Sequence, residues 1–187
     1  MKIQIIGGSG TGKSTLAKFI SEKENSMWID TDRYLWKDES FTENYPIEKR
    51  IEMYEKDMES KDEYVVSGSV FSWNPNGFSN RDLFVFLYLD EEMRMERLRN
   101  REIRRNNPKK TWTDEYGNNT NEFLEWCKTY LKEQDKTMIG TYAAQSYEME
   151  LSKSPIVKLD SSQTVEELYL AIQAWLKSDS TFIDEIT

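Results

Sequence analysis

A glycine-rich stretch near the start of the chain has the residue types of a phosphate-binding loop. Residues 7–14 read Gly-Gly-Ser-Gly-Thr-Gly-Lys-Ser and fit the pattern G-x-x-x-x-G-K-[ST]. Glycines let the backbone point N–H groups at phosphate oxygens, and the N-terminus of a following helix adds partial positive charge. In such a loop Lys13 reaches the β- and γ-phosphates, and the Ser14 hydroxyl binds Mg²⁺. The motif predicts ATP and Mg²⁺ as cofactors, bound at Gly8, Ser9, Gly10, Thr11, Gly12, Lys13, Ser14 and Thr15.

The residues on either side of this loop fit the backbone that it needs. Ile3, Ile5 and Ile6 precede it as a short β-branched strand, and apolar residues follow it at helical spacing, beginning with Leu16 and Ala17. A chance glycine turn is the alternative, but such a turn has no reason to lie between a strand and a helix. The order of strand, glycine loop and helix therefore favours a nucleotide-binding loop.

A second concentration of charge runs from residue 94 to residue 110, with eight basic residues and two acidic ones. Positions at steps of three and four share one face of a helix, and four basic positions follow these steps: Arg94, Arg97, Arg101 and Arg104 or Arg105. Guanidinium groups so close together repel one another unless an anion lies among them, and arginine suits the charge of a phosphoryl group in transfer. A solvated face balanced by acidic neighbours and an RNA-binding stripe are the alternatives.

The rest of the chain alternates strand and helix patterns. Four more segments are typical of strands: 26–29, 63–67, 83–89 and 155–159. Helical patterns lie between them, starting at Pro46, after Asp90, near Asn121 and at Thr164, where Glu167 completes a capping box. This order predicts an α/β fold with a five-stranded parallel sheet between two layers of helices.

Ligands of such a sheet collect at the carboxyl ends of its strands. Asp30, Asp32 and Ser67 fall at or just past predicted strand ends. An aspartate in this place often caps the next helix, which we expect for Asp90, and we expect a turn at Asp160. Asp30, Asp32 and Ser67 thus place carboxylate and hydroxyl oxygen at the edge of the sheet where ligands collect.

The composition narrows the available chemistry. The 187 residues suit one domain, and with a net charge of −9 we expect no attraction of the chain as a whole to nucleic acid. Cys127 is the only cysteine and histidine is absent, which excludes an internal disulfide, a cysteine zinc site and histidine-dependent nucleophiles. Any metal must be a hard cation held by oxygen. No apolar stretch is long enough to span a membrane, and we expect a cytoplasmic location.

Taken together, the sequence resembles the P-loop small-molecule kinases, the group of adenylate, shikimate and gluconate kinases, and bacterial AAA-type adenylate-kinase-like ATPases. The resemblance rests on the loop 7–15, the strand ends 28–32 and 65–68, and the arginines 97–101. It implies a three-layer P-loop NTPase fold of the adenylate-kinase type. It also implies that Asp30 or Asp32 faces the acceptor and that Arg97 and Arg101 contact the nucleotide. Nucleotide kinases usually carry Asp-Gly where this chain has Ser67 before Gly68.

The same resemblance implies an organisation of the chain. We expect one kinase-like domain over residues 1–178, with an acceptor-covering insert near 32–62, a lid-like region near 99–122 and a flexible tail at 179–187. Aromatic residues gather around the insert and either line the acceptor pocket or pack the insert onto the sheet. They are Trp28, Tyr34, Trp36, Phe41, Tyr45, Phe71, Trp73 and Phe78. Arg81 is a candidate for gripping an acceptor anion.

The leading hypothesis is an ATP- and Mg²⁺-dependent phosphotransferase whose acceptor is a nucleotide, a nucleoside or a small hydroxylated metabolite. Lys13 and the loop amides would hold phosphate, Asp30 or Asp32 would orient the acceptor, and Arg97 and Arg101 would neutralise the moving phosphoryl group. A nucleotide-binding regulatory ATPase without a small-molecule acceptor is the alternative, favoured by Ser67. A nucleic-acid-processing enzyme is a third option. The sequence determines neither the acceptor, nor ATP over GTP, nor the oligomeric state.

Overall fold

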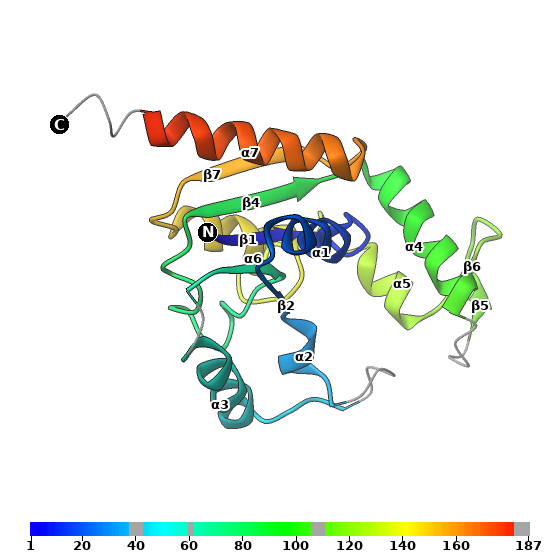
Figure 1. Ribbon diagram of the computed structural model, residues 1–187. Helices are drawn as coiled ribbons and strands as arrows, with labels where there is room; N and C mark the ends of the chain where they lie inside the picture. Colours follow the sequence, from blue (N-terminus) through cyan, green and yellow to red (C-terminus); the bar gives the residue numbers. More distant parts are fainter. Residues whose placement is uncertain (38–42, 60–61, 106–110, 182–187) are drawn as a thin grey trace.

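A computed structural model describes residues 1–37, 43–59, 62–105 and 111–181 of the chain. Its centre is a five-stranded sheet in the order β2-β3-β1-β4-β7 (Figure 1), in which all neighbouring strands are parallel. The strands are β1 (Lys2–Gly7), β2 (Met27–Asp30), β3 (Tyr64–Ser67), β4 (Leu83–Tyr88) and β7 (Ile156–Asp160). The five-stranded parallel sheet predicted from the sequence is confirmed.

Helices cover both faces of this sheet. On one face, α1 (Lys13–Glu24) packs beside α7 (Val165–Thr181), and α6 (Tyr142–Glu150) covers the other (Figure 1). The short α2 (Asp32–Leu35) and α3 (Ile47–Met58) lie beyond the carboxyl end of β2. A separate group holds α4 (Glu91–Arg105), α5 (Glu122–Cys127) and the two-stranded hairpin of β5 (Trp112–Thr113) and β6 (Asn119–Thr120).

Alternate residues of β1 and β4 face opposite layers of helices. Ile3, Ile5 and Val85 pack with Leu16 and Ile20 of α1 in one fully buried cluster. Ile6, Phe84 and Phe86 pack with Met149 of α6 on the opposite face. Because both faces are covered, the strands are apolar almost throughout, as parallel strands must be.

Two capping expectations and one expected turn are confirmed. The Asp90 carboxylate accepts from the Glu92 and Met93 amides at the start of α4. The Thr164 amide donates to Glu167, and the Glu167 amide donates back to the Thr164 hydroxyl, which is the expected capping box. Asp160 accepts from the Ser162 amide in a turn.

Other expectations are corrected by the packing. The helical pattern near Asn121 predicts Phe123, Trp126 and Tyr130 on one face, but the buried face of α5 is formed by Leu124 and Cys127, and Trp126 is partly exposed. The register changes because Leu124 and Cys127 pack on Met95 and Leu98 of α4. Helix α7 continues to Thr181, so the tail expected at 179–187 begins within this helix, and residues 182–187 lie outside the described ranges.

Helix α6 is not among the predicted helices. Its buried residues are Gln145, Glu148 and Met149, so most of its inward face is polar and gives no apolar periodicity. Glu148 accepts hydrogen bonds from the Gln4 side chain and from the Ser69 hydroxyl at 3.2 and 2.6 Å. Arg81 donates to Gln4, the Phe78 carbonyl and Ser152, which places its guanidinium in this interior network.

We expect Glu148→Gln to gain stability relative to the wild-type protein as the pH rises. Burial raises the pKa of Glu148 above its ordinary value of 4.5. Folding therefore favours the protonated carboxyl, so this contribution is full below the ordinary pKa and is lost as the pH rises through the higher folded pKa. Thermal melts of both proteins between about pH 4 and pH 8 measure the change. A difference in Tm that stays constant over this range would contradict the prediction.

Candidate active site

The loop between β1 and α1 has the backbone of a phosphate-binding loop. Gly10 and Gly12 have φ angles of 91° and 87°, in the left-handed region that favours glycine. A Cβ atom at Gly10 would also lie 2.9 Å from the Leu98 side chain of α4, so space and backbone angle both require glycine there. The Leu16 amide donates to the Gly12 carbonyl at 3.0 Å, and no side chain caps the start of α1. The first amides of α1 therefore face the cleft uncapped by protein.

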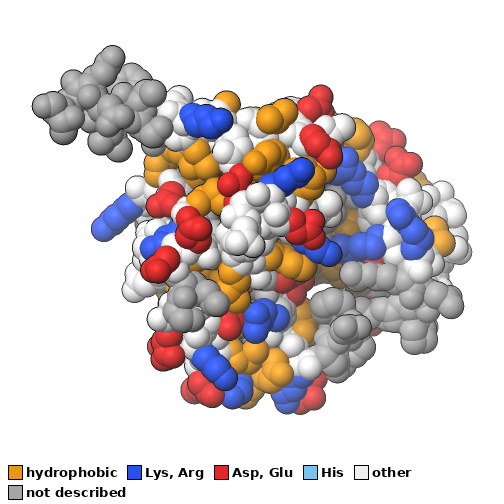
Figure 2. All heavy atoms as spheres, in the orientation of Figure 1, with side chains coloured by type: hydrophobic (Ala, Val, Ile, Leu, Met, Phe, Trp, Pro, Cys, Tyr) orange, Lys and Arg blue, Asp and Glu red, His pale blue; other side chains and the backbone are white. Residues whose placement is uncertain are grey.

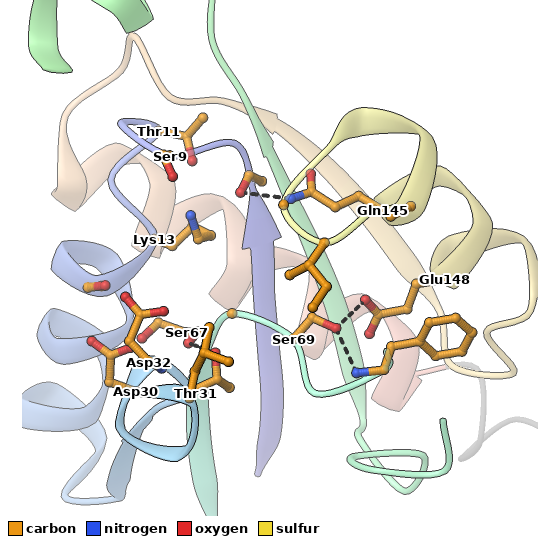
Figure 3. Close-up of a pocket in the computed structure, with 18 of the residues that line it drawn as sticks. Ser9, Thr11, Lys13, Asp30, Thr31, Asp32, Ser67, Ser69, Gln145 and Glu148 are labelled. Carbon is orange, nitrogen blue, oxygen red and sulfur yellow. Dashed lines mark hydrogen bonds between the residues drawn. The ribbon is translucent and has the colours of Figure 1, made fainter. Parts of the chain in front are cut away.

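Lys13 lies under this loop. Its Nζ donates to the Gly8 carbonyl at 3.1 Å, and Figure 3 shows the side chain below Ser9 and Thr11 of the loop. Burial lowers the pKa of Lys13, while the carboxylates of Asp32 and Asp30 act in the opposite direction. The ammonium group thus lies between the loop carbonyls and two carboxylates.

Asp30 and Asp32 lie below Lys13 at the end of β2 (Figure 3). The Asp30 carboxylate accepts from the Asp32 amide at 3.2 Å. Burial and then the charge of Asp32 raise the pKa of Asp30, while Lys13 and a hydrogen bond from Ser14 lower it. The sequence predictions for Lys13, Ser14, Asp30 and Asp32 thus fall on one cluster of side chains.

Ser67 ends β3 next to this cluster. Its hydroxyl accepts from the Trp28 indole N–H at 3.1 Å, and its carbonyl accepts from the Thr31 amide at 3.0 Å. These bonds tie the ends of β2 and β3 together. Ser67 is buried and its side chain is engaged with Trp28, so it supplies hydroxyl oxygen where a carboxylate was the usual residue of the kinases that the sequence resembles.

The arginines of α4 divide into two groups. Arg97, Arg101 and Arg104 line the cleft, as the helical spacing predicts. Arg97 donates to the Ser161 carbonyl at 3.0 Å, and the Arg101 guanidinium lies 5.3 Å from the centre of the Phe123 ring. Arg94 is only 1% exposed and points into the protein, so its place in the anion-binding stripe is corrected. The Arg105 side chain and the lysines 109 and 110 lie outside the described part of the structure.

The cleft around these residues has a volume of about 2370 Å³. On the face drawn in Figure 2, basic side chains gather around the hollow between α1 and α4. The loop residues Ser9, Gly10, Thr11, Gly12, Lys13, Ser14 and Thr15 line the cleft. Gly8 is the exception, because the ring of Tyr130 lies against it.

Trp36, Phe71 and Trp73 line the far side of the cleft with Arg50. Desolvation alone lowers the pKa of Arg50, and its Nε donates to the Tyr45 carbonyl at 2.8 Å. Other aromatic residues of this region pack edge to face on α2 and α3, with Tyr34, Tyr54, Trp73 and Phe78 in one cluster. Trp36 and Phe71 thus line the cleft, Tyr34 and Phe78 pack α2 and α3 onto the sheet, and Trp73 does both. Phe41 lies outside the described ranges.

Comparison with known proteins decides the family. A family described as "AAA domain" matches residues 3–134. This chain belongs to that family. The AAA-domain match includes the phosphate loop, the carboxylates after β2 and all the arginines of α4.

Two relatives are similar to this AAA-domain chain in sequence. "Uncharacterized protein YqaC" of Bacillus subtilis (strain 168) is 31% identical over 177 residues, which cover 95% of this chain and 98% of the relative. A cytidylate kinase of Archaeoglobus fulgidus is 33% identical over 115 residues, which cover 54% of this chain and 62% of the kinase.

Solved structures share the AAA-domain chain's fold at lower identity. A gluconokinase from Sinorhizobium meliloti 1021 has a TM-score of 0.59 and 19% identity, with 97% of this chain and 95% of the kinase covered. A shikimate kinase from Aquifex aeolicus has a TM-score of 0.52 and 20% identity, with 97% and 99% covered. The expected resemblance to P-loop small-molecule kinases and their three-layer α/β fold is confirmed.

The oxygen donors near Lys13 fit a hard cation. Mg²⁺ is held in such proteins by one or two protein oxygens together with phosphate and water, and does not need a cage of side chains. Ser14, Asp30 and Asp32 provide hydroxyl and carboxylate oxygen in one place. Among the described residues no group of three or more His, Cys, Asp or Glu side chains could hold a metal by itself.

Within the described ranges, no helix has the length and apolar content of a membrane span.

Three residues contact the loop in a way that the sequence did not predict: Gln145 and Tyr130 carry no sequence signal of a site, and Arg94 was expected to face an anion in the cleft. Gln145 of α6 donates to the Gly7 carbonyl at 3.0 Å, and Arg94 donates to the Ser9 carbonyl at 2.9 Å. Tyr130, in the turn after α5, donates to Gln145 at 2.8 Å. They come from segments 85 to 138 residues from the loop atoms that they bind, and only the folded chain brings them together.

Proposed function

We propose that this protein transfers a phosphoryl group from ATP, with Mg²⁺, to a small molecule that is a nucleotide, a nucleoside or a small hydroxylated metabolite. The observation that carries this proposal is one cleft in which the phosphate loop and Lys13 face the carboxylates of Asp30 and Asp32. The likeness to kinases in fold and in part of the sequence supports the reaction type.

Each charged residue of the cleft has a role in this proposal. The loop amides and Lys13 hold the β- and γ-phosphates, and Ser14 with Asp30 or Asp32 holds Mg²⁺. Bound Mg²⁺ would supply positive charge against the phosphate oxygens. Arg97 and Arg101 neutralise charge on the group in transfer. Catalysis then consists mainly of positioning and electrostatic stabilisation in a preformed site.

On the acceptor side, Asp30 orients the acceptor hydroxyl and accepts its proton. Its burial beside Asp32 raises its pKa, which makes it a better proton acceptor than an exposed aspartate. Arg50 adds a cation at the far wall, among Trp36 and Trp73. Acceptors that combine a hydroxyl or phosphate with a second anionic group are therefore the first to test.

We expect ATP with Mg²⁺ to raise the Tm of the protein and one class of acceptor to raise it further. A ligand present at about a hundred times its Kd adds about 2.7 kcal/mol of stability. The panel holds nucleoside monophosphates, nucleosides, neutral sugars and hydroxy acids, followed by a coupled assay for ADP release. Release of ADP that depends on one acceptor supports the proposal, whereas binding of ATP without transfer to any acceptor would contradict it.

The second candidate is a nucleotide-dependent regulatory ATPase. It is favoured by Ser67, whose hydroxyl is engaged by Trp28 where related kinases usually have an aspartate. ATP binding and slow ATP hydrolysis that no acceptor in the panel accelerates would favour this candidate.

A further inference from the structure

The phosphate loop is held from behind by side chains that take no part in the proposed chemistry. Gln145, Tyr130 and Arg94 are 9%, 7% and 1% exposed, so all three act inside the protein. Buried polar groups of this kind are costly unless they are fully hydrogen-bonded, and each of these residues makes defined bonds. Their shared partner is the loop between β1 and α1.

Arg94 fixes the direction of an amide that phosphate needs. The Ser9 carbonyl and the Gly10 N–H belong to one planar trans peptide, so they point in opposite directions. Arg94 donates to that carbonyl at 2.9 Å, so the N–H of Gly10, a residue that lines the cleft, points away from the Arg94 guanidinium. The same guanidinium donates to the Cys127 carbonyl at 2.6 Å and is paired with Glu91, which leaves it little freedom.

Tyr130 and Gln145 form a second support. The Tyr130 hydroxyl donates to Gln145 Oε1, and this sets the amide so that Nε2 donates to the Gly7 carbonyl where the loop leaves β1. The Tyr130 ring also lies against Gly8, where a Cβ atom would be 3.0 Å from Cζ. The Arg94 guanidinium lies 4.8 Å from the centre of the same ring, so the two supports are joined.

We infer that Arg94, Tyr130 and Gln145 are positioning residues that form a clamp, which holds the phosphate loop in its anion-binding conformation before the nucleotide arrives. The inference rests on the nucleotide binding of the proposed function, not on the identity of the acceptor. Because the clamp already orders the loop, binding of the nucleotide costs less conformational entropy. The contribution of the clamp is therefore measured as nucleotide affinity. It also links the loop to α5 and α6, which carry no motif residue.

Calorimetric titration of MgATP and of inorganic tripolyphosphate tests the clamp. Tyr130→Phe removes the hydrogen bond from Tyr130 to Gln145, whereas Gln145→Leu removes that bond and the bond to the Gly7 carbonyl. Arg94→Lys keeps the charge but not the forked geometry. We expect the Kd of both probes to rise by about fivefold in each variant, the factor of roughly one neutral hydrogen bond. The double variant of Tyr130 and Gln145 should have a Kd no higher than that of the single variant with the higher Kd. Both changes break the same series of hydrogen bonds from Tyr130 through Gln145 to Gly7, so their effects should not add.

Tyr142→Phe is the matched control. Tyr142 lies in α6 and its ring packs on Tyr130 at 6.2 Å, yet its hydroxyl has no hydrogen-bond partner in the described ranges. This control should bind both probes like the wild-type protein. A variant that lowers Tm but binds the probes with unchanged Kd well below its melting temperature would reduce these residues to structural supports and overturn the clamp. Tight MgATP binding by the wild type without transfer to any acceptor would instead contradict the proposed function and leave the clamp intact.

Discussion

Lys13→Ala is expected to lower the kcat for phosphoryl transfer by about a thousandfold and to raise the KM for ATP about tenfold. The ammonium group lies under the phosphate loop, held by the Gly8 carbonyl and beside Asp30 and Asp32. It is already partly dehydrated, so it needs little reorganisation when the charge of the γ-phosphate shifts in the transition state. Removal of a preorganised group of this kind typically costs about two to three orders of magnitude in rate. Steady-state kinetics at saturating acceptor measures both constants.

Lys18→Ala is the control for Lys13→Ala. Lys18 lies on the same helix and carries the same charge, but its side chain is 60% exposed and pairs loosely with Glu22 at 3.9 Å. Such exposed pairs contribute little, so this control should match the wild-type enzyme in rate, KM and Tm. The apo form of Lys13→Ala should also keep its Tm, because the change relieves the burial of a charge. Full nucleotide affinity in Lys13→Ala would show that the loop does not bind triphosphate as proposed.

The parts of the site that follow from local chemistry were predictable from the sequence. A glycine loop between an apolar strand and a helix determines its own backbone, so the positions of Lys13 and Ser14 follow from nearby residues alone. The central strands β3, β1 and β4 were predicted because strands buried on both faces are apolar runs with clear ends. The edge strands β2 and β7 are less buried and were predicted from short apolar segments that end at an aspartate. Asp30 and Asp32 were predicted as site residues because parallel strands bring their carboxyl ends to one edge of the sheet.

What the sequence could not show depends on packing between distant segments. The spacing of the arginines places Arg94 and Arg97 on one helix face, but it does not say that α5 covers the first and leaves the second open. Helix α6 gave no signal because Gln145 and Glu148 occupy its buried face, where apolar residues are expected. Gln145 is buried where it donates to the Gly7 carbonyl, and Glu148 is buried where it accepts from the Gln4 side chain of β1. Such partners are defined only in the folded chain.

Asp30→Asn is expected to lower the kcat for transfer by about a hundredfold or more, with a KM for ATP that stays within about threefold of the wild-type value. A positioned proton acceptor contributes roughly two to four orders of magnitude to a rate. The amide keeps the size of the side chain and can still accept from the Asp32 amide, but it cannot take up the acceptor proton. Because the loop, Lys13 and the arginines of α4 are unchanged, ATP binding persists and the loss appears in kcat. Kinetics with saturating ATP and varied acceptor separates the two effects.

Two matched variants make the assignment specific. Asp160→Asn changes an aspartate at the end of β7, the opposite edge strand of the same sheet, where the carboxylate accepts only from a turn amide in the described structure, and it should leave transfer unchanged. Asp32→Asn removes the exposed carboxylate next to Asp30, and we expect a smaller loss of kcat than in Asp30→Asn because Asp30, the more buried of the two, keeps its place at the end of β2. If Asp32→Asn is the more damaging change, the proton acceptor is Asp32. If neither change lowers transfer by more than about threefold, the rate comes from the phosphate loop and α4 alone, and acid–base catalysis at this edge of the sheet is wrong.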